Sequence, residues 1–122
     1  MDEVTLTFGL KEVGRFSVYR LHPWSLGIHI EEEWRGQGLS RRMMNVMLDE
    51  WRARDEYDPA RVLYIDTDAS SGFWDHIGMK ANPDVENTKL PQYGYEKCIT
   101  VKELDNYLNF TKNLNYHEKN MR

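Results

Sequence analysis

Residues 26–51 read LGIHIEEEWRGQGLSRRMMNVMLDEW and carry the strongest structural signal in the chain. The first five of them, Leu26–Ile30, alternate apolar and polar side chains, which is the period of a strand with one buried face. From Leu39 the apolar residues recur at helical spacing, with charged residues between them. These apolar positions are Met43, Met44, Met47, Leu48 and Trp51. The stretch therefore predicts a strand, a loop with two glycines, and an amphipathic helix that ends near Arg54.

Shorter patterns on both sides predict a sheet around this helix. Val4–Leu10 and Arg15–Leu21 alternate with strand period, and a turn through Lys11–Gly14 would join them into a hairpin. Val62–Ile65 is a short apolar run typical of a buried strand. Further elements are expected as a short helix over Ser70–Ile77 and strands at Met79–Ala81 and Gln92–Ile99. This order predicts an α/β fold of the mixed α+β kind, with helices packed on one sheet.

The C-terminal part adds one more helix. Thr100 and Glu103 form a capping-box pair, which predicts a helix that begins there and runs to about Leu114. Its apolar side would consist of Leu104, Tyr107, Leu108 and Leu114. We expect a single domain over residues 1–122, in which residues 99–122 are an extra helix and tail. The apolar side would either fold back over its own sheet or dock on a second copy in a homodimer.

Composition excludes several classes of protein. The hydrophobic fraction of 40% argues against a disordered chain, yet no apolar run reaches the length that a bilayer requires. The start of the sequence lacks a signal-peptide pattern, and the lone Cys98 forms no disulfide within the chain. We therefore expect a cytoplasmic protein with no membrane partner and no metal. The net charge of −4 argues against electrostatic binding of nucleic acid.

The loop before the long helix predicts an anion site. Gly36 and Gly38 remove Cβ atoms where a ligand would approach the backbone. The helix that follows presents unpaired N–H groups and the positive end of its dipole. Arg35 adds a charge, and Arg41 or Arg42 could reach a second phosphate. A lone Gly-x-Gly also occurs in ordinary strand–helix connections, and the loop matches neither the dinucleotide fingerprint nor the Walker motif.

Two motifs carry a family resemblance. The first is Arg35-Gly36-Gln37-Gly38-Leu39-Ser40, preceded by Glu33-Trp34, and the second is Phe73-Trp74-Asp75-His76-Ile77-Gly78-Met79. In this order and spacing they resemble the R-x-x-G-x-G/A motif and the later aromatic block of the GNAT superfamily of acyl-CoA-dependent N-acyltransferases. The resemblance covers about Phe8–Ile99.

The resemblance implies a fold and a ligand. A mostly antiparallel sheet would be splayed between the Leu26–Ile30 and Val62–Ile65 strands, with acetyl-CoA in the cleft. The backbone of Ile28 and Ile30 would pair with the pantetheine arm, and the loop amides with the pyrophosphate. The residues expected at the cofactor are Ile28, Ile30, Arg35, Gly36, Gln37, Gly38, Leu39, Ser40, Ser70 and Trp74. The implied activity is transfer of an acetyl group to a primary amine by direct attack in a ternary complex.

Direct attack needs a base that takes a proton from the amine. His29 is the first candidate, because it alternates with the core-facing residues of its strand. Glu31 lies on the same face and is the rival, while His22 and His76 are weaker candidates. The acceptor amine, on a small molecule or a protein, is not identified by the sequence.

Three departures from the family pattern keep other functions open. Ser40 stands where glycine or alanine is usual, and Trp74 stands where the family often has a tyrosine acid. An indole N–H is a donor but no practical acid. Family members also usually carry another strand and two helices before the segment that matches Val4. The alternative is a non-catalytic acyl-CoA-binding or interaction module, and a third possibility is a structural partner protein without a cofactor.

Overall fold

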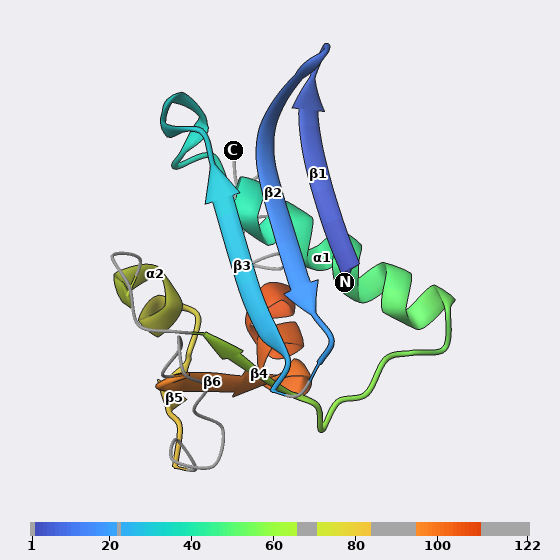
Figure 1. Cartoon of the computed structure of the whole chain (residues 1–122), viewed down its shortest axis with the longest axis vertical. Helices are drawn as coiled ribbons and strands as arrows, with labels where there is room; N and C mark the ends of the chain where they lie inside the picture. Colours follow the sequence, from blue (N-terminus) through green and yellow to red (C-terminus); the bar gives the residue numbers. More distant parts are fainter. Residues whose placement is uncertain (1, 22, 66–70, 84–94, 111–122) are drawn as a thin grey trace, which may run out of the picture.

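The computed structural model describes residues 2–21, 23–65, 71–83 and 95–110. Within them the chain is a mixed α+β protein, with one six-stranded mixed sheet and three helices (Figure 1). The strands are β1 (Asp2–Phe8), β2 (Lys11–Tyr19), β3 (Ser25–Ile30), β4 (Val62–Ile65), β5 (Lys80–Ala81) and β6 (Lys97–Thr100). The helices are α1 (Leu39–Ala53), α2 (Ser71–His76) and a helix over residues 101–110, and a 3-10 turn spans Glu32–Trp34. The strand order is β1-β2-β3-β4-β6-β5.

The hairpin of β1 and β2 turns earlier than the sequence predicts. Phe8 pairs with Lys11, so the turn consists of Gly9 and Leu10, and Gly9 adopts a left-handed φ of 64°. The predicted turn through Lys11–Gly14 is therefore wrong. Gly14 lies inside β2, where a Cβ atom would come 3.3 Å from the Cε of Met43. The glycine there permits the close approach of α1 and does not break the strand.

Helix α1 supplies the centre of the core, as its periodicity predicts. Its five predicted apolar residues are all at most 2% exposed: Met43, Met44, Met47, Leu48 and Trp51. They pack against the inner face of β1–β3, for example on Phe16 and Val18. The predicted bounds of α1 and of the β3 and β4 strands agree with the structure within one residue. Among the described residues, no helix is long and apolar enough to cross a bilayer.

The helix over residues 101–110 folds back onto the same core. The predicted capping box is present: Thr100 N–H donates to Glu103 Oε1 at 3.1 Å, and Glu103 N–H donates to Thr100 Oγ1 at 3.1 Å. Leu104 and Leu108 are at most 2% exposed and belong to the main core cluster. A second copy is therefore not needed to cover this helix, which removes the reason given above for a homodimer. The predicted Leu114 lies outside the described residues.

The sheet opens between β3 and β4. β3 pairs with β2 along its whole length, but it shares only one registered parallel pair with β4, Ser25 with Tyr64. The amide of Tyr64 donates to the carbonyl of Trp24 at 2.8 Å, just before β3 begins. Figure 1 shows the two strands separating from this point toward the end of β3. The C-terminal half of β3 consequently faces a gap in the sheet.

The two faces of β1–β3 differ. One face packs on α1, and Figure 1 shows none of the described helices in front of the other. The outer face carries exposed polar side chains: Glu3, Thr5, Glu12, Arg15 and His29. This face is hydrophilic, so it does not require cover from another apolar surface.

Candidate ligand site

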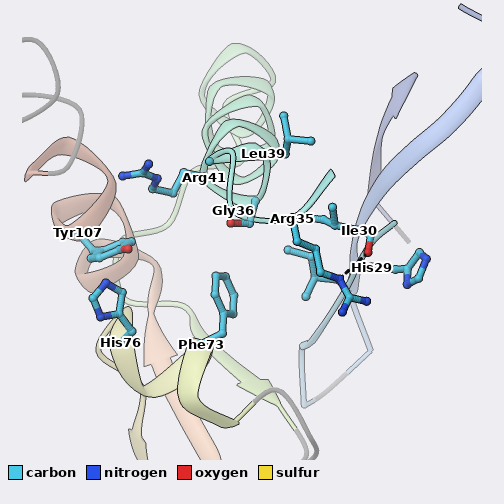
Figure 2. Close-up of a pocket in the computed structure, with 12 residues that line it drawn as sticks. His29, Ile30, Arg35, Gly36, Leu39, Arg41, Phe73, His76 and Tyr107 are labelled. Carbon is cyan, nitrogen blue, oxygen red and sulfur yellow. Dashed lines mark hydrogen bonds between the residues drawn. The ribbon is translucent and has the colours of Figure 1, made fainter. Parts of the chain in front are cut away.

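A cavity of about 790 Å³ lies where the sheet opens (Figure 2). Its volume falls within the ~300–1,000 Å³ of typical small-molecule sites. Four parts of the fold line it: β3, the loop and first turn of α1, α2, and the helix over residues 101–110. On one side are Ile28, His29 and Ile30 of β3; along the top are Arg35, Gly36, Gly38, Leu39, Ser40 and Arg41; opposite are Phe73, His76 and Tyr107. The cavity thus brings together seven of the ten residues that the sequence assigns to a cofactor.

The loop into α1 leaves backbone donors at the cavity. Gly36 and Gly38 have left-handed φ values of 80° and 74°, which only glycine adopts without strain. Gly38 is the N-cap of α1, no side chain caps this end, and the first helical hydrogen bond runs from Arg42 N–H to Gly38 O. The N–H groups of Leu39 and Ser40 precede that bond, so they have no partner within the helix. This end of α1 is therefore available to an anion.

Two arginines that line the cavity, and the arginine that follows them in α1, lack an acidic partner among the described residues. Within the described part of the chain, every other arginine lies within 4.0 Å of a carboxylate, whereas Arg35, Arg41 and Arg42 do not. Arg35 donates from Nε to the carbonyl of Ile30 at 3.0 Å. A Cβ atom on Gly38 would meet Nη2 of Arg41 at 3.0 Å, so the guanidinium of Arg41 lies against the N-cap.

The charge of the cavity is opposite to that of the chain. The chain has a net charge of −4, yet the described residues that line the cavity include two arginines and no carboxylate. The dipole of α1 adds positive potential at the same place, where cations are otherwise unfavourable. An anion with more than one charge would satisfy both the arginines and the helix end.

The edge of β3 supplies a different kind of surface. Along a strand, the backbone groups of successive residues point alternately to the two neighbouring strands. The Trp24 carbonyl points to β4 and the Glu31 amide points to β2, where it donates to Val13 O at 2.9 Å. By this alternation the backbone groups of Ile28 and Ile30 point into the gap. Their side chains and Phe73 are half-buried and apolar, so this side suits an extended chain with amide groups.

His29 and Glu31 lie on the outer face of the sheet. The His29 side chain is 63% exposed, and its Nε2 is 3.8 Å from Oε1 of Glu31. Figure 2 shows the ring directed away from Phe73, His76 and Tyr107, across β3 from them. The strand alternation predicts this placement, since His29 pairs with Arg15 of β2. The two candidate bases therefore reach the cavity's contents only through the gap between the strands.

Other predicted site residues lie elsewhere. Gln37 faces a second cavity of about 360 Å³ beside the Lys11–Glu33 ion pair. Trp74 does not line the main cavity: it is 2% exposed and packs in the core, so the residues of this motif that line the cavity are Phe73 and His76. Ser70 and His22 lie outside the described residues.

Cys98 is poorly suited to nucleophilic catalysis. Burial and the charge of Glu103 raise the pKa of its thiol above the ordinary value. A thiol with a raised pKa forms less of the reactive thiolate at neutral pH. It is also not among the residues that line the main cavity.

Two aromatic residues of the far wall come together only in the folded chain. His76 comes from α2 and Tyr107 from the helix over residues 101–110; their ring centroids are 6.1 Å apart at an interplanar angle of 83°. The sequence marks Tyr107 only as part of an apolar helix side. A weak signal was available: tyrosine on such a side tends to lie at its edge, with the hydroxyl toward water. Nothing in the sequence pairs it with His76.

Comparison with known proteins adds no relative, because no family model and no curated protein matches the chain. Within the described residues, no group of three or more His, Cys, Asp or Glu side chains could hold a metal ion. The chemistry of the site is therefore argued from its geometry and from the two sequence motifs.

Proposed function

We propose that this chain is a GNAT-like N-acyltransferase that transfers the acetyl group of acetyl-CoA to a primary amine. The observation that carries the proposal is the positive cavity beside β3, which joins arginines without acidic partners and free helix amides in a chain of net negative charge. The resemblance of Arg35–Ser40 and Phe73–Met79 to family motifs supports the same conclusion.

Acetyl-CoA combines two parts that the cavity can hold separately. Its pyrophosphate would accept hydrogen bonds from the amides of Leu39 and Ser40 and from the side chain of Arg35. Its pantetheine arm, an extended chain with amides, would pair with the backbone of Ile28 and lie along the apolar side of β3. This orientation follows from the direction of β3, which leads into the phosphate loop.

The thioester would then lie in the gap between β3 and β4, open to both faces of the sheet. The amine approaches from the outer face, where His29 accepts its proton and Glu31 orients the imidazole from 3.8 Å. The amine nitrogen bonds to the acyl carbon and the carbon–sulfur bond breaks. The electron pair of that bond leaves on sulfur, and CoA departs as a thiolate. A thiol with a pKa near ~8.5 is a tolerable leaving group, so a missing acid at Trp74 does not prevent the reaction.

A non-catalytic acyl-CoA-binding module is the second candidate. Two observations favour it: the His29 ring is 63% exposed and directed away from the cavity, and Trp74 is buried in the core. Such a module would use the same anion site without needing a base. Binding and turnover therefore have to be measured separately.

The test is a screen of amine acceptors with release of free CoA thiol as the readout, run beside direct titration of acetyl-CoA. The enzyme predicts thiol release with at least one acceptor. His29→Ala should lower kcat by about 10²–10⁴-fold with little change in acetyl-CoA affinity. Thr5→Ala, on the same outer face, is the matched control and should leave both unchanged.

The outcomes separate the candidates. Binding without turnover across the screen would support the non-catalytic module. Turnover that is unchanged in His29→Ala, but lost in Glu31→Gln, would move the base to Glu31. An absence of acetyl-CoA binding would exclude both functions.

A further inference from the structure

The far wall of the main cavity is not used by the proposed binding of pantetheine and pyrophosphate. It is formed by His76 and Tyr107, whose rings meet nearly at right angles at 6.1 Å. The helix that carries Tyr107 follows the last strand of the sheet and packs on the core through Leu104 and Leu108. The wall therefore depends on the C-terminal helix, which lies outside the two family-like motifs.

The aromatic wall lies beside one of the two arginines that line the cavity, across the cavity from β3. Figure 2 shows Arg35 on the β3 side of the cavity, and Arg41 extending from α1 to the side of Tyr107 and His76. The free amides at the start of α1 lie between these two sides. A ligand with phosphates at the helix end would have one arm on β3 and the other on the aromatic wall.

The chemistry of the wall favours a flat, electron-rich ring. His76 is exposed and Tyr107 is half-buried, so both rings have surface to offer a ligand. Aromatic side chains bind nucleic-acid bases by stacking, and a guanidinium beside them adds a cation for a phosphate or for the ring. Among the described residues that line the cavity, none is a carboxylate that would repel a phosphate. Aliphatic side chains would suit a purely apolar arm better than these two rings do.

We infer that His76 and Tyr107 form a subsite for the purine base of a nucleotide, with Arg41 beside it for a phosphate on the ribose. The identification of that nucleotide with the adenosine 3′-phosphate end of CoA rests on the proposed function. The subsite itself rests on the wall, and any purine nucleotide with a suitably placed phosphate would use it. The C-terminal helix thus contributes directly to ligand recognition.

The test is calorimetric titration with three probes: CoA, adenosine 3′,5′-bisphosphate and 4′-phosphopantetheine, which lacks the nucleoside. The wild-type chain should bind the bisphosphate on its own. His76→Ala and Tyr107→Leu should each weaken the binding of CoA and of the bisphosphate by about tenfold, which is within the range for loss of one stacking contact. Both should leave the affinity for 4′-phosphopantetheine within about twofold of wild type, because that probe has no base to stack.

Two controls keep the result specific. Tyr107→Phe retains the ring and should retain the affinity for CoA. Tyr19→Leu makes the same change at an exposed tyrosine of β2 and should have no effect on the binding of any probe.

Arg41→Ala should reduce the preference for CoA over dephospho-CoA, since the charge beside the ribose phosphate is then lost. His76 is exposed, so its variant tests the wall even where Tyr107→Leu loses stability.

An equal loss for 4′-phosphopantetheine and CoA would overturn the subsite, because the rings would then shape the whole cavity. Unchanged affinity for CoA in both variants would also overturn it. The result is separable from the proposed function. Bisphosphate binding that depends on His76, in a chain without acetyl transfer, would support the subsite and exclude the enzyme. Acetyl transfer, together with unchanged CoA affinity in the His76 and Tyr107 variants, would support the enzyme and exclude the subsite.

Discussion

The arginines at the two ends of α1 differ in their partners. Beside the C-terminal end of α1, Arg20 and Arg54 both reach Asp2, and Arg20 also pairs with Glu56. At the same end of α1, Arg52 binds Asp105 at 2.6 Å and joins α1 to the helix over residues 101–110. At the other end of α1, Arg35, Arg41 and Arg42 have no carboxylate within 4.0 Å among the described residues.

The two helix starts differ in the same way. The helix over residues 101–110 is closed by the side chains of Thr100 and Glu103, and α1 begins at Gly38 with no side-chain cap. The chain therefore satisfies charges and backbone donors where elements pack on each other. It leaves them open around the cavity, although cations at a helix N-terminus are unfavourable without an anion. Under the proposed function, the open groups serve a ligand and the closed groups serve stability.

The largest effect is expected from Arg35→Ala combined with Arg41→Ala. Because each charge-assisted hydrogen bond contributes about 1.5–3 kcal/mol, the double variant should bind acetyl-CoA at least about 100-fold more weakly. Stability should stay within about 0.5 kcal/mol, since neither side chain has an acidic partner to lose. Calorimetry and urea unfolding measure the two quantities. Arg15→Ala, at a paired and exposed arginine, is the control. A large loss of stability with normal acetyl-CoA affinity in the double variant would show that Arg35 and Arg41 stabilise the fold and do not bind the ligand.

A second test removes the charge of Asp2, which pairs with Arg20 and Arg54 beside the C-terminal end of α1. Its Oδ2 accepts hydrogen bonds from Trp51 Nε1 at 2.8 Å and from Arg20 Nε at 2.6 Å. Asp2→Asn should lower the free energy of unfolding by about 1–3 kcal/mol, because it removes the charge from these bonds. Acetyl-CoA affinity should not change. Asp49→Asn, at a side chain 76% exposed, is the matched control for urea unfolding.

The same carboxylate predicts a pH dependence. Burial opposes ionisation of Asp2, but the hydrogen bonds from Trp51 and Arg20 outweigh it and hold its pKa below the ordinary 3.8. A carboxyl whose folded pKa is lowered contributes stability above its unfolded pKa and loses it as the pH falls through the folded value. Wild-type stability should thus fall more steeply than that of Asp2→Asn below a pH of about 4. Parallel curves for the two proteins would show that Asp2 has no such role.

The smallest effect is expected at the closed helix start. Thr100→Ala removes the hydroxyl that caps the helix over residues 101–110 and should cost about 1 kcal/mol of stability. Thermal unfolding measures this loss, with Thr5→Ala as the control. A loss of acetyl-CoA affinity much larger than the stability change explains would mean that the cap also shapes the cavity.

Local patterns predict the elements that depend on local physics. The bounds of α1, the strand Val62–Ile65 and the capping box at Thr100 follow from spacing within a few residues, and the structure has all three. The hairpin turn was misplaced because Gly14 looks like a breaker in sequence. Its real reason is the contact with Met43, which lies on another element.

The candidate site also has a part that depends on local sequence and a part that depends on packing. The loop Arg35–Ser40 is contiguous, so its glycines and arginine indicate an anion site without a fold. His76 and Tyr107 come together only through the packing of α2 and the last helix, which no spacing reveals. Trp74 shows the opposite case: its motif position suggests a ligand contact, whereas the structure packs its side chain in the core.

The most direct test of the account is binding of acetyl-CoA to the open end of α1, measured by thermal unfolding and calorimetry. At about a hundred times its dissociation constant, the ligand should stabilise the fold by ~2.7 kcal/mol. Gly38→Val should abolish this stabilisation, because a side chain at a φ of 74° is strained and its Cβ would lie 3.0 Å from Arg41 Nη2. No stabilisation of the wild-type chain, or equal stabilisation of a folded Gly38→Val variant, would contradict the account.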